Sequence, residues 1–213
     1  MKSSLGRKIA MSLSGIFLIL FLTLHVSLNL TSVFSADLFN KVSHFFGYDP
    51  FIQYLGQPIL ASGVIFHFVM GFVLEIRNHR ARRIKYVYKY NSASWISRNM
   101  IITGGVILCY FCLHWYDFWF HELNYKFVEM KVPDPERYYP ELVSKFQNPW
   151  RTLFYCLAFI MLGLHLWHGF YSSMQSIGFD NKYARFLGKV GKVFAIVVPS
   201  GFITIALVHH FLY

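Results

Sequence analysis

Charged residues are scarce in this chain of 213 residues. Asp, Glu, Lys and Arg make up 14% of it, against about 25% in an ordinary soluble domain. Hydrophobic residues account for 55% of the sequence and aromatic residues for 20%. So few charges on so apolar a chain argue against a soluble globular protein.

Cysteine is also rare. The three cysteines are Cys109, Cys112 and Cys156. Cys109 and Cys112 have the CxxC spacing, but an iron–sulfur cluster takes four ligands, so one such pair cannot hold it. We interpret all three as packing residues buried inside helices.

Charge is absent altogether from five long windows. Each window can supply the ~20 apolar residues that a membrane-spanning helix needs. We therefore predict an all-α membrane protein with one transmembrane domain over residues 1–213 and helices at about 9–33, 55–76, 99–120, 150–174 and 191–211. The windows are Ile9–Ala36, Pro50–Leu74, Asn99–Tyr116, Thr152–Phe179 and Val193–Tyr213.

The connections between the windows carry few structural signals. The stretch from Glu122 to Pro149 is the longest polar one, and its segments 132–135 and 138–140 have the proline content of a loop. We find no internal repeat in the sequence.

The formal charge of +10 is distributed unevenly over these connections. If the five windows cross the membrane in turn, one face carries 14 Lys and Arg against 2 acids, in residues 2–8, 75–98 and 180–192, and the other carries 6 against 8. The basic face should be cytoplasmic, so the N-terminus lies inside and the C-terminus outside. The basic residues lack the interleaved aromatics of a nucleic-acid surface. They could also bind anionic lipid.

Histidine is frequent inside the windows. A polar side chain in hydrocarbon is costly and marks a functional site by default. For His209 and His210, close to the C-terminus, a hydrogen bond to a neighbouring helix is sufficient reason. The seven histidines in the windows are His25, His67, His114, His165, His168, His209 and His210.

Four of these histidines fall at two depths. His25 and His114 lie 17 and 16 residues beyond the nearest cytoplasmic charge, about 25 Å at ~1.5 Å per residue. His67 and His165, on helices that run the other way, lie closer to the cytoplasm. Two levels of two histidines on antiparallel helices are what two bis-histidine b-type haems require.

Two other kinds of site fit this pattern less well. A zinc site would need its ligands at one depth, often with Cys or a carboxylate, and a proton-relay transporter would need Asp or Glu within the windows. His168 competes with His165 for the fourth ligand. We prefer His165 for its depth and because Gly169, like Gly71 after His67, leaves a spot without a side chain one turn along the helix.

The stretches around these histidines resemble the cytochrome b subunit of bacterial succinate:quinone oxidoreductases and quinol:fumarate reductases, in the form with five helices, two haems and a single anchor polypeptide. The resemblance covers nearly the whole chain. Its matching stretches are residues 19–26, 38–45, 66–71, 103–104, 113–115 and 165–171.

The resemblance implies a function. Its haem ligands fall on His25 and His114 for the outer haem and on His67 and His165 for the inner haem. Such a subunit, in the bacterial cytoplasmic membrane, docks a flavoprotein with FAD and an iron–sulfur protein on its cytoplasmic face. It passes electrons between them and a quinone, usually menaquinone. Another respiratory anchor, of the hydrogenase or formate dehydrogenase type, and a histidine-lined transporter remain alternatives.

The chain departs from some relatives at two positions. Where they have a proton-conducting glutamate, this chain has Gly163, so that role is not expected here. Where they have an acidic residue at the quinone cavity, a rough alignment gives Tyr48. We therefore take His44, Tyr48 and Asp49 as quinone-site candidates. We take Ser12, Ser97 and Arg98, near the inner edge, as candidates to contact the carboxylates of the inner haem.

Overall fold

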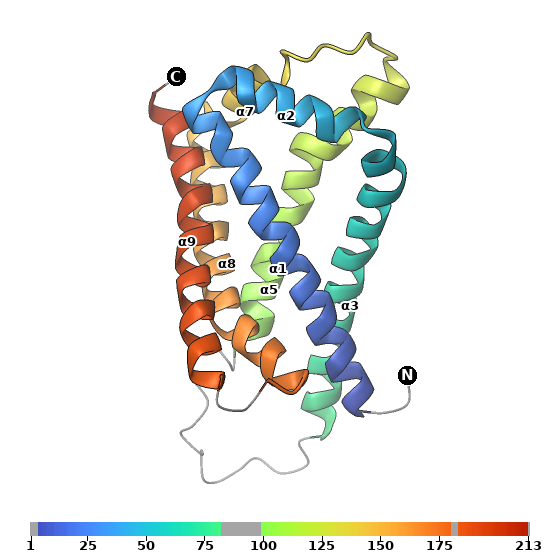
Figure 1. The fold of residues 1–213 in the computed structure, drawn as a ribbon, viewed down its shortest axis with the longest axis vertical. Helices are drawn as coiled ribbons and strands as arrows, with labels where there is room; N and C mark the ends of the chain where they lie inside the picture. Colours follow the sequence, from blue (N-terminus) through green and yellow to red (C-terminus); the bar gives the residue numbers. More distant parts are fainter. Residues whose placement is uncertain (1–3, 82–98, 180–182, 213) are drawn as a thin grey trace.

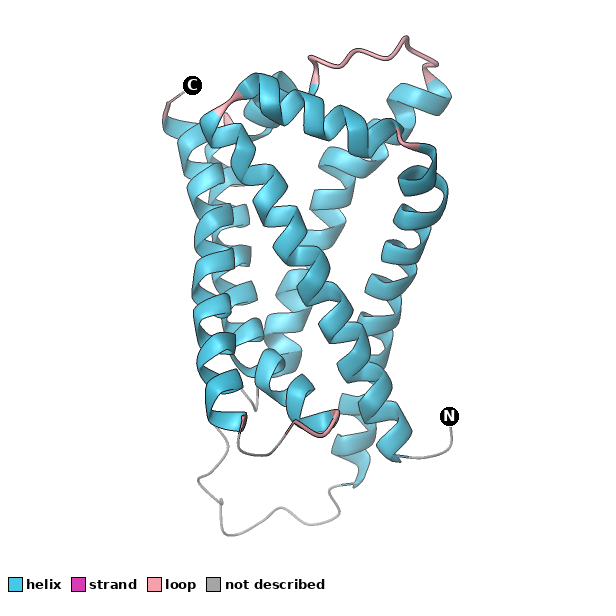
Figure 2. Cartoon of the chain, viewed as in Figure 1, coloured by secondary structure: helices cyan, strands magenta, loops and turns pink. Residues whose placement is uncertain are grey.

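The protein is described by a computed structural model that covers residues 4–81, 99–179 and 183–212 (Figure 1). The described part of the chain is helical, with short loops and no strand (Figure 2). The predicted all-α class is therefore confirmed. The five long helices are α1 (Ser4–Phe34), α3 (Gln57–Ala81), α5 (Met100–His114), α8 (Pro149–Ser176) and α9 (Ala184–Phe211).

Two of the long helices continue into π-helical turns. The π-helix η1 (Ile52–Gly56) leads directly into α3. On the other side, α5 runs on through η2 (Trp115–Phe120), α6 (His121–Leu123) and η3 (Asn124–Val128). With these extensions, five helical segments are long and apolar enough to cross a membrane. The prediction of five such helices is confirmed.

The five long helices stand side by side along the length of the molecule (Figure 1). α8 and α9 form the most extensive helix pair, and α1 contacts α3, α8 and α9. Two shorter helices, α2 (Ala36–Tyr48) and α7 (Tyr138–Phe146), lie across the end of the bundle that holds the C-terminus, and the N-terminus lies at the opposite end. We call the end with α2 and α7 the outer end, after the predicted orientation.

Local sequence signals begin and end several helices. The Ser35 side chain accepts a hydrogen bond from the Leu38 N–H and so caps the start of α2. Asn148 does the same for α8 by accepting from the N–H groups of Trp150 and Arg151, and Pro149 occupies the first helical position. After α8, Gly178 adopts φ +97, the left-handed conformation common beyond a helix end.

The segment 138–140 is helical, so its prediction as a loop was wrong. Pro140 lies in the first turn of α7, where no intrahelical N–H bond is needed. The Tyr139 N–H donates to the Asn40 side-chain oxygen at 2.7 Å, and the Asn40 amide donates to the Glu136 carbonyl at 3.1 Å. The residue that organises the start of α7 therefore comes from α2, about a hundred positions earlier, beyond the reach of local sequence signals.

Small residues allow α8 and α9 to pack closely. A Cβ atom on Gly191 would lie 2.7 Å from the Phe170 ring, and one on Gly163 would lie 3.0 Å from the Ala195 carbonyl oxygen. The backbone of α9 thus occupies the space that a larger side chain at position 163 would need.

The cysteines do not occupy the core. Cys109 and Cys112 are exposed on α5, and Cys156 is partly buried on α8. Their prediction as buried packing residues was wrong for the first two. Cys behaves as a small hydrophobe, and the outer surface of a membrane-spanning helix is also apolar, so residue type alone could not separate the two cases.

Candidate functional site

The four predicted histidines form two facing pairs. The imidazole rings of His25 and His114 have centroids 5.8 Å apart and an interplanar angle of 86°; we call them the outer pair. Those of His67 and His165, the inner pair, are 6.4 Å apart at 72°. His67 thus faces His165 and not His168, which lies three residues further along α8.

The spacing of both pairs fits one iron atom between two imidazoles. A metal ion about 2 Å from each ring nitrogen puts the two ring centroids roughly 6 Å apart, as in both pairs. No group of three or more His, Cys, Asp or Glu side chains is arranged to hold a metal ion in the described part of the chain. Each pair therefore suits a metal that brings its remaining ligands with it, as the iron of a haem does.

The inner pair is held by hydroxyl groups from neighbouring helices. Ser14 Oγ on α1 lies 3.0 Å from His67 Nδ1 on α3. Thr103 Oγ1 on α5 lies 3.2 Å from His165 Nδ1 on α8. Both hydroxyls are buried, with 9% of Ser14 and 1% of Thr103 exposed. Because Nδ1 is engaged in both rings, Nε2 is the atom left to bind a metal.

The outer pair is held from within its own helices. The Asn29 amide nitrogen lies 3.4 Å from His25 Nδ1 and donates to the His25 carbonyl at 2.8 Å. The Tyr110 hydroxyl lies 3.4 Å from His114 Nδ1. An aromatic ring four residues earlier stacks on each imidazole, Phe21 on His25 at 5.2 Å and Tyr110 on His114 at 5.4 Å.

Four glycines stand close to the inner pair. A Cβ atom on Gly15 would lie 3.5 Å from the His67 ring, and one on Gly104 would lie 3.7 Å from the His165 ring. At Gly71 and Gly169, which we predicted as spots without a side chain, the nearest atom is in both cases a methionine methyl carbon at 3.6 Å, so a methionine covers each spot in this structure. Methionine is unbranched and adapts its position readily.

The two halves of this site repeat each other, so the prediction of no internal repeat was wrong. Five positions on α1 recur on α5 with the single offset of 89 residues that separates His25 from His114. On α3 and α8, an offset of 98 relates His67 to His165 and Gly71 to Gly169. The matching positions on α1 and α5 are Met11 and Met100, Ser14 and Thr103, Gly15 and Gly104, Phe21 and Tyr110, and His25 and His114.

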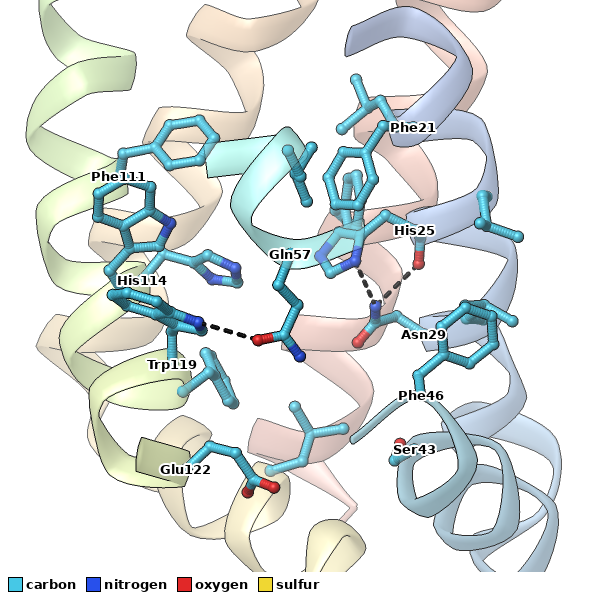
Figure 3. A pocket seen from close by; sticks show the side chains of 18 of the residues that line it. Phe21, His25, Asn29, Ser43, Phe46, Gln57, Phe111, His114, Trp119 and Glu122 are labelled. Carbon is cyan, nitrogen blue, oxygen red and sulfur yellow. Dashed lines mark hydrogen bonds between the residues drawn. The ribbon is translucent and has the colours of Figure 1, made fainter. Parts of the chain in front are cut away.

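A cavity of about 430 Å³ surrounds the outer pair and extends towards α2 and α7. His25 and His114 project into it from opposite sides (Figure 3). Most of its walls are apolar and aromatic. Polar groups gather towards the outer end, where the Trp119 indole N–H donates to the Gln57 amide oxygen at 3.3 Å and Glu122 and Ser43 line the wall.

The three quinone-site candidates lie beside this cavity and do not line it. The His44 ring stacks near the Tyr48 ring with centroids 4.7 Å apart, and Lys126 Nζ lies 4.0 Å from the centre of the Tyr48 ring. Asp49 follows α2, and its Oδ1 accepts a hydrogen bond from the Ile52 N–H at 2.9 Å. Asp49 therefore acts as a helix cap in this structure.

A charged cluster closes the outer end of the cavity. Arg137 is bound to Glu122 and, through Nη1, to both oxygens of Glu141 at 3.0 Å, and Lys126 pairs with Glu122 at 2.6 Å. Burial alone would lower the pKa of Arg137, but its hydrogen bonds to Glu122 and Glu141 hold that pKa above its usual range. Burial and then the Glu122 charge raise the pKa of Tyr138, which therefore keeps its proton at neutral pH.

A buried carboxylate lies three residues beyond His114. Asp117 is 1% exposed, accepts a hydrogen bond from the Tyr155 hydroxyl at 2.9 Å and pairs with Arg151 Nε at 3.3 Å. The charge count by face places Asp117 among the eight acids of the outer connections. The helix continues beyond Tyr116 and turns this side chain into the bundle, where Arg151 at the start of α8 compensates its charge.

The remaining candidates lie near the inner end. Ser12 is buried on α1, with 5% exposed. Ser97 and Arg98 lie outside the described residues. Ser14, which contacts His67, was missed as a functional residue although it is only two positions from Ser12. Its signal in the sequence, the match with Thr103 at the offset of the histidines, becomes recognisable only once the helices are paired.

Five apolar helices around two partly buried histidine pairs define an all-helical, multi-pass membrane protein. The family model for the succinate dehydrogenase/fumarate reductase transmembrane subunit matches residues 75–200, and the chain belongs to this family. The match contains His114 and His165, one histidine of each pair, and begins after His25 and His67. Neither the curated proteins nor the solved structures compared with this chain gave a match.

Proposed function

We propose that this subunit is a dihaem cytochrome b, the membrane anchor of a succinate:quinone oxidoreductase or quinol:fumarate reductase. His25 and His114 hold the outer haem iron, and His67 and His165 hold the inner one. When bound, the two haems supply one-electron carriers between the iron–sulfur partner subunit and a quinone. We assign the whole chain to a single domain in the bacterial cytoplasmic membrane.

The observation that carries this proposal is the existence of two histidine pairs with the same spacing. One facing pair could be a helix contact between polar residues. The two pairs have ring centroids 5.8 and 6.4 Å apart, and their histidines lie at helix positions that repeat along the chain. Two copies of one cofactor explain this arrangement better than two unrelated helix contacts do. Family membership favours this function over that of a hydrogenase or formate dehydrogenase anchor and over that of a transporter.

The chain's own residues do three things in this function. The helices fix the depth of each histidine pair, and with it the order of the two sites across the bundle. The aromatic side chains Phe21 and Tyr110 restrict the rotation of the outer imidazoles by stacking on them. The apolar walls exclude water, which is one of the ways in which a protein tunes a haem potential.

We place quinone at the outer end of the cavity. A quinone headgroup is flat and apolar with two carbonyl oxygens, and it needs hydrogen-bond donors in an aromatic setting. Gln57 and Ser43 offer such groups from the cavity wall. We retain His44 and Tyr48 as residues that support this region from α2, while Asp49 is assigned to capping. The chemistry fits menaquinone, the quinone that the resemblance implies.

The partners dock at the opposite end of the bundle. A flavoprotein carrying FAD converts succinate and fumarate, and an iron–sulfur protein connects it to the inner pair. The basic residues of the N-terminus and of the two inner connections give this end a charge of +12. Such a surface suits acidic partners and anionic lipid headgroups. Half of these basic residues lie outside the described part of the chain.

The proposal is tested by purifying the complex from its membrane and recording a reduced-minus-oxidised spectrum. We expect a b-type signal, reduction of part of it by succinate, and co-purification of a polypeptide with covalent or bound flavin. Absence of b-type haem would contradict the proposal. A b-type signal with a hydrogenase or formate dehydrogenase partner would contradict the succinate assignment alone.

A further inference from the structure

Each inner histidine has a hydrogen-bonding contact at Nδ1 with a side chain from another helix. Ser14 on α1 reaches His67 on α3, and Thr103 on α5 reaches His165 on α8. Each hydroxyl also lies close to a carbonyl three residues earlier on its own helix. Ser14 Oγ donates to the Met11 carbonyl at 2.8 Å, and Thr103 Oγ1 donates to the Met100 carbonyl at 3.0 Å.

Counting hydrogens decides which ring nitrogen carries the proton. A hydroxyl group has one hydrogen to donate and two lone pairs that accept. If that hydrogen goes to the carbonyl, the contact with Nδ1 is favourable only when Nδ1 carries a proton and donates. If Nδ1 carried no proton, the single hydroxyl hydrogen could be donated either to Nδ1 or to the carbonyl oxygen. The hydroxyl oxygen would then face the other acceptor without a hydrogen between them. Both inner histidines are therefore held as the tautomer with Nδ1–H and a lone pair on Nε2.

We infer that Ser14 and Thr103 are positioning residues for the inner haem: each hydroxyl fixes the tautomer and orientation of one axial histidine so that Nε2 faces the iron. This inference rests on the proposed dihaem function. Neither hydroxyl touches the iron. Each acts through the imidazole, in the manner of the outer-shell partners that orient metal-bound histidines and raise their basicity.

The internal repeat supports this role independently of either contact taken alone. Ser14 and Thr103 are equivalent positions, both β-hydroxyl residues, both followed by a glycine that lies against the histidine ring. In the described part of the chain, neither outer histidine has a hydroxyl group from another helix at Nδ1. Their Nδ1 atoms face Asn29 and Tyr110, four residues away on the same helix, at the longer distance of 3.4 Å.

The hydroxyl contacts should affect the reduction potential of the inner haem. A donating Nδ1–H makes the imidazole a stronger base, and a stronger base favours ferric over ferrous iron. Loss of one hydroxyl should then shift the equilibrium between ferric and ferrous iron about tenfold towards ferrous iron. For a one-electron couple, that change raises the midpoint potential by about 59 mV.

The experiment is a redox titration of the haems in the purified complex carrying Thr103→Val or Ser14→Ala. We expect the midpoint potential of one haem to rise and that of the other to stay unchanged, with both haems still bound. Thr103→Ser and Ser14→Thr keep the hydroxyl and should restore the original potential. Ser27→Ala is the matched control, since Ser27 Oγ bonds only the Thr23 carbonyl on the exposed side of α1.

Three results would overturn the inference. Unchanged potentials of both haems in Thr103→Val and Ser14→Ala would show that the hydroxyls do not act on the ligands. A shift of the outer haem alone, or an equal shift in the hydroxyl-keeping variants, would assign the effect to packing. If the wild-type complex contains no inner haem, the proposed function itself fails, and that outcome is seen before any variant is made.

Discussion

Hydrogen-bonding partners are found for His209 and for the four histidines of the two pairs, and the identity of the partner separates these histidines by role. His209, 0% exposed at the end of α9, bonds Ser32 through Nε2 at 2.9 Å and so joins α9 to α1. The inner pair instead uses Nδ1 for its hydroxyl contact. This choice of nitrogen leaves Nε2 as the atom that can bind a metal.

A first prediction about single residues distinguishes His165 from its neighbour His168. His165→Ala should abolish the inner haem because its ring is the one that faces His67. His168→Ala should leave both haem signals in place, since the ring that faces His67 belongs to His165. Reduced-minus-oxidised spectra of the two variants check this, and loss of haem from His168→Ala alone would show that the fourth ligand is wrongly assigned.

A second prediction concerns the buried carboxylate. Tyr155→Phe removes a hydrogen bond to the Asp117 carboxyl group, which pairs with Arg151, and should lower the free energy of unfolding by about 1.5–3 kcal/mol. Thermal unfolding of the detergent-solubilised protein measures the change. Tyr116→Phe is the control, because Tyr116 is 67% exposed and its loss of a hydroxyl should have little effect. Equal stabilities of the two variants would contradict a structural role for the Asp117 contact.

The role of a single residue could be predicted from the sequence where that role depends on position along a helix. The four histidines could be paired because depth follows from the number of residues to the nearest charge. The hydroxyls of Ser14 and Thr103 could not be assigned, because their partners are set by which helices are neighbours and by how each is rotated. Asp117 was misplaced for a related reason, since the end of a charge-free window does not mark the end of a helix.

At the scale of helices, close approach of α8 and α9 stabilises the bundle. Phe159 and Phe202 stack across this contact with ring centroids 5.1 Å apart, and Gly191 lets the backbone of α9 approach Phe170. The five spans were predictable because apolar content and length are local properties. The helix α7 was not, because a side chain of α2 organises its first turn.

The prediction for this contact is that Gly191→Ala destabilises the protein by about 1–3 kcal/mol, because the added methyl group would overlap Phe170 near its Cβ and force the helices apart. Gly188→Ala is the control on the same helix. Its Cβ would meet the Tyr171 ring at 3.8 Å, an ordinary contact, so this variant should be neutral or slightly stabilised. Thermal unfolding of both variants decides, and a Gly191→Ala protein as stable as Gly188→Ala would contradict the packing argument.

At the scale of the whole molecule, the termini lie at opposite ends of the bundle (Figure 1), as an odd number of spans requires. The charge difference between the ends, +12 against −2, predicts a cytoplasmic N-terminus. A reporter enzyme that is active only outside the cytoplasm should be active when fused to the C-terminus and inactive when fused after Arg83. The reverse pattern would invert the membrane orientation and place the partner subunits on the wrong face.

The central claim, two haems held by two histidine pairs, is tested most directly by counting haem per polypeptide. We predict two haems per chain in the wild-type protein, one in His25→Ala and one in His67→Ala, with different spectral components missing from the two variants. A wild-type protein with one haem or none, or two variants that lose the same component, would contradict the account.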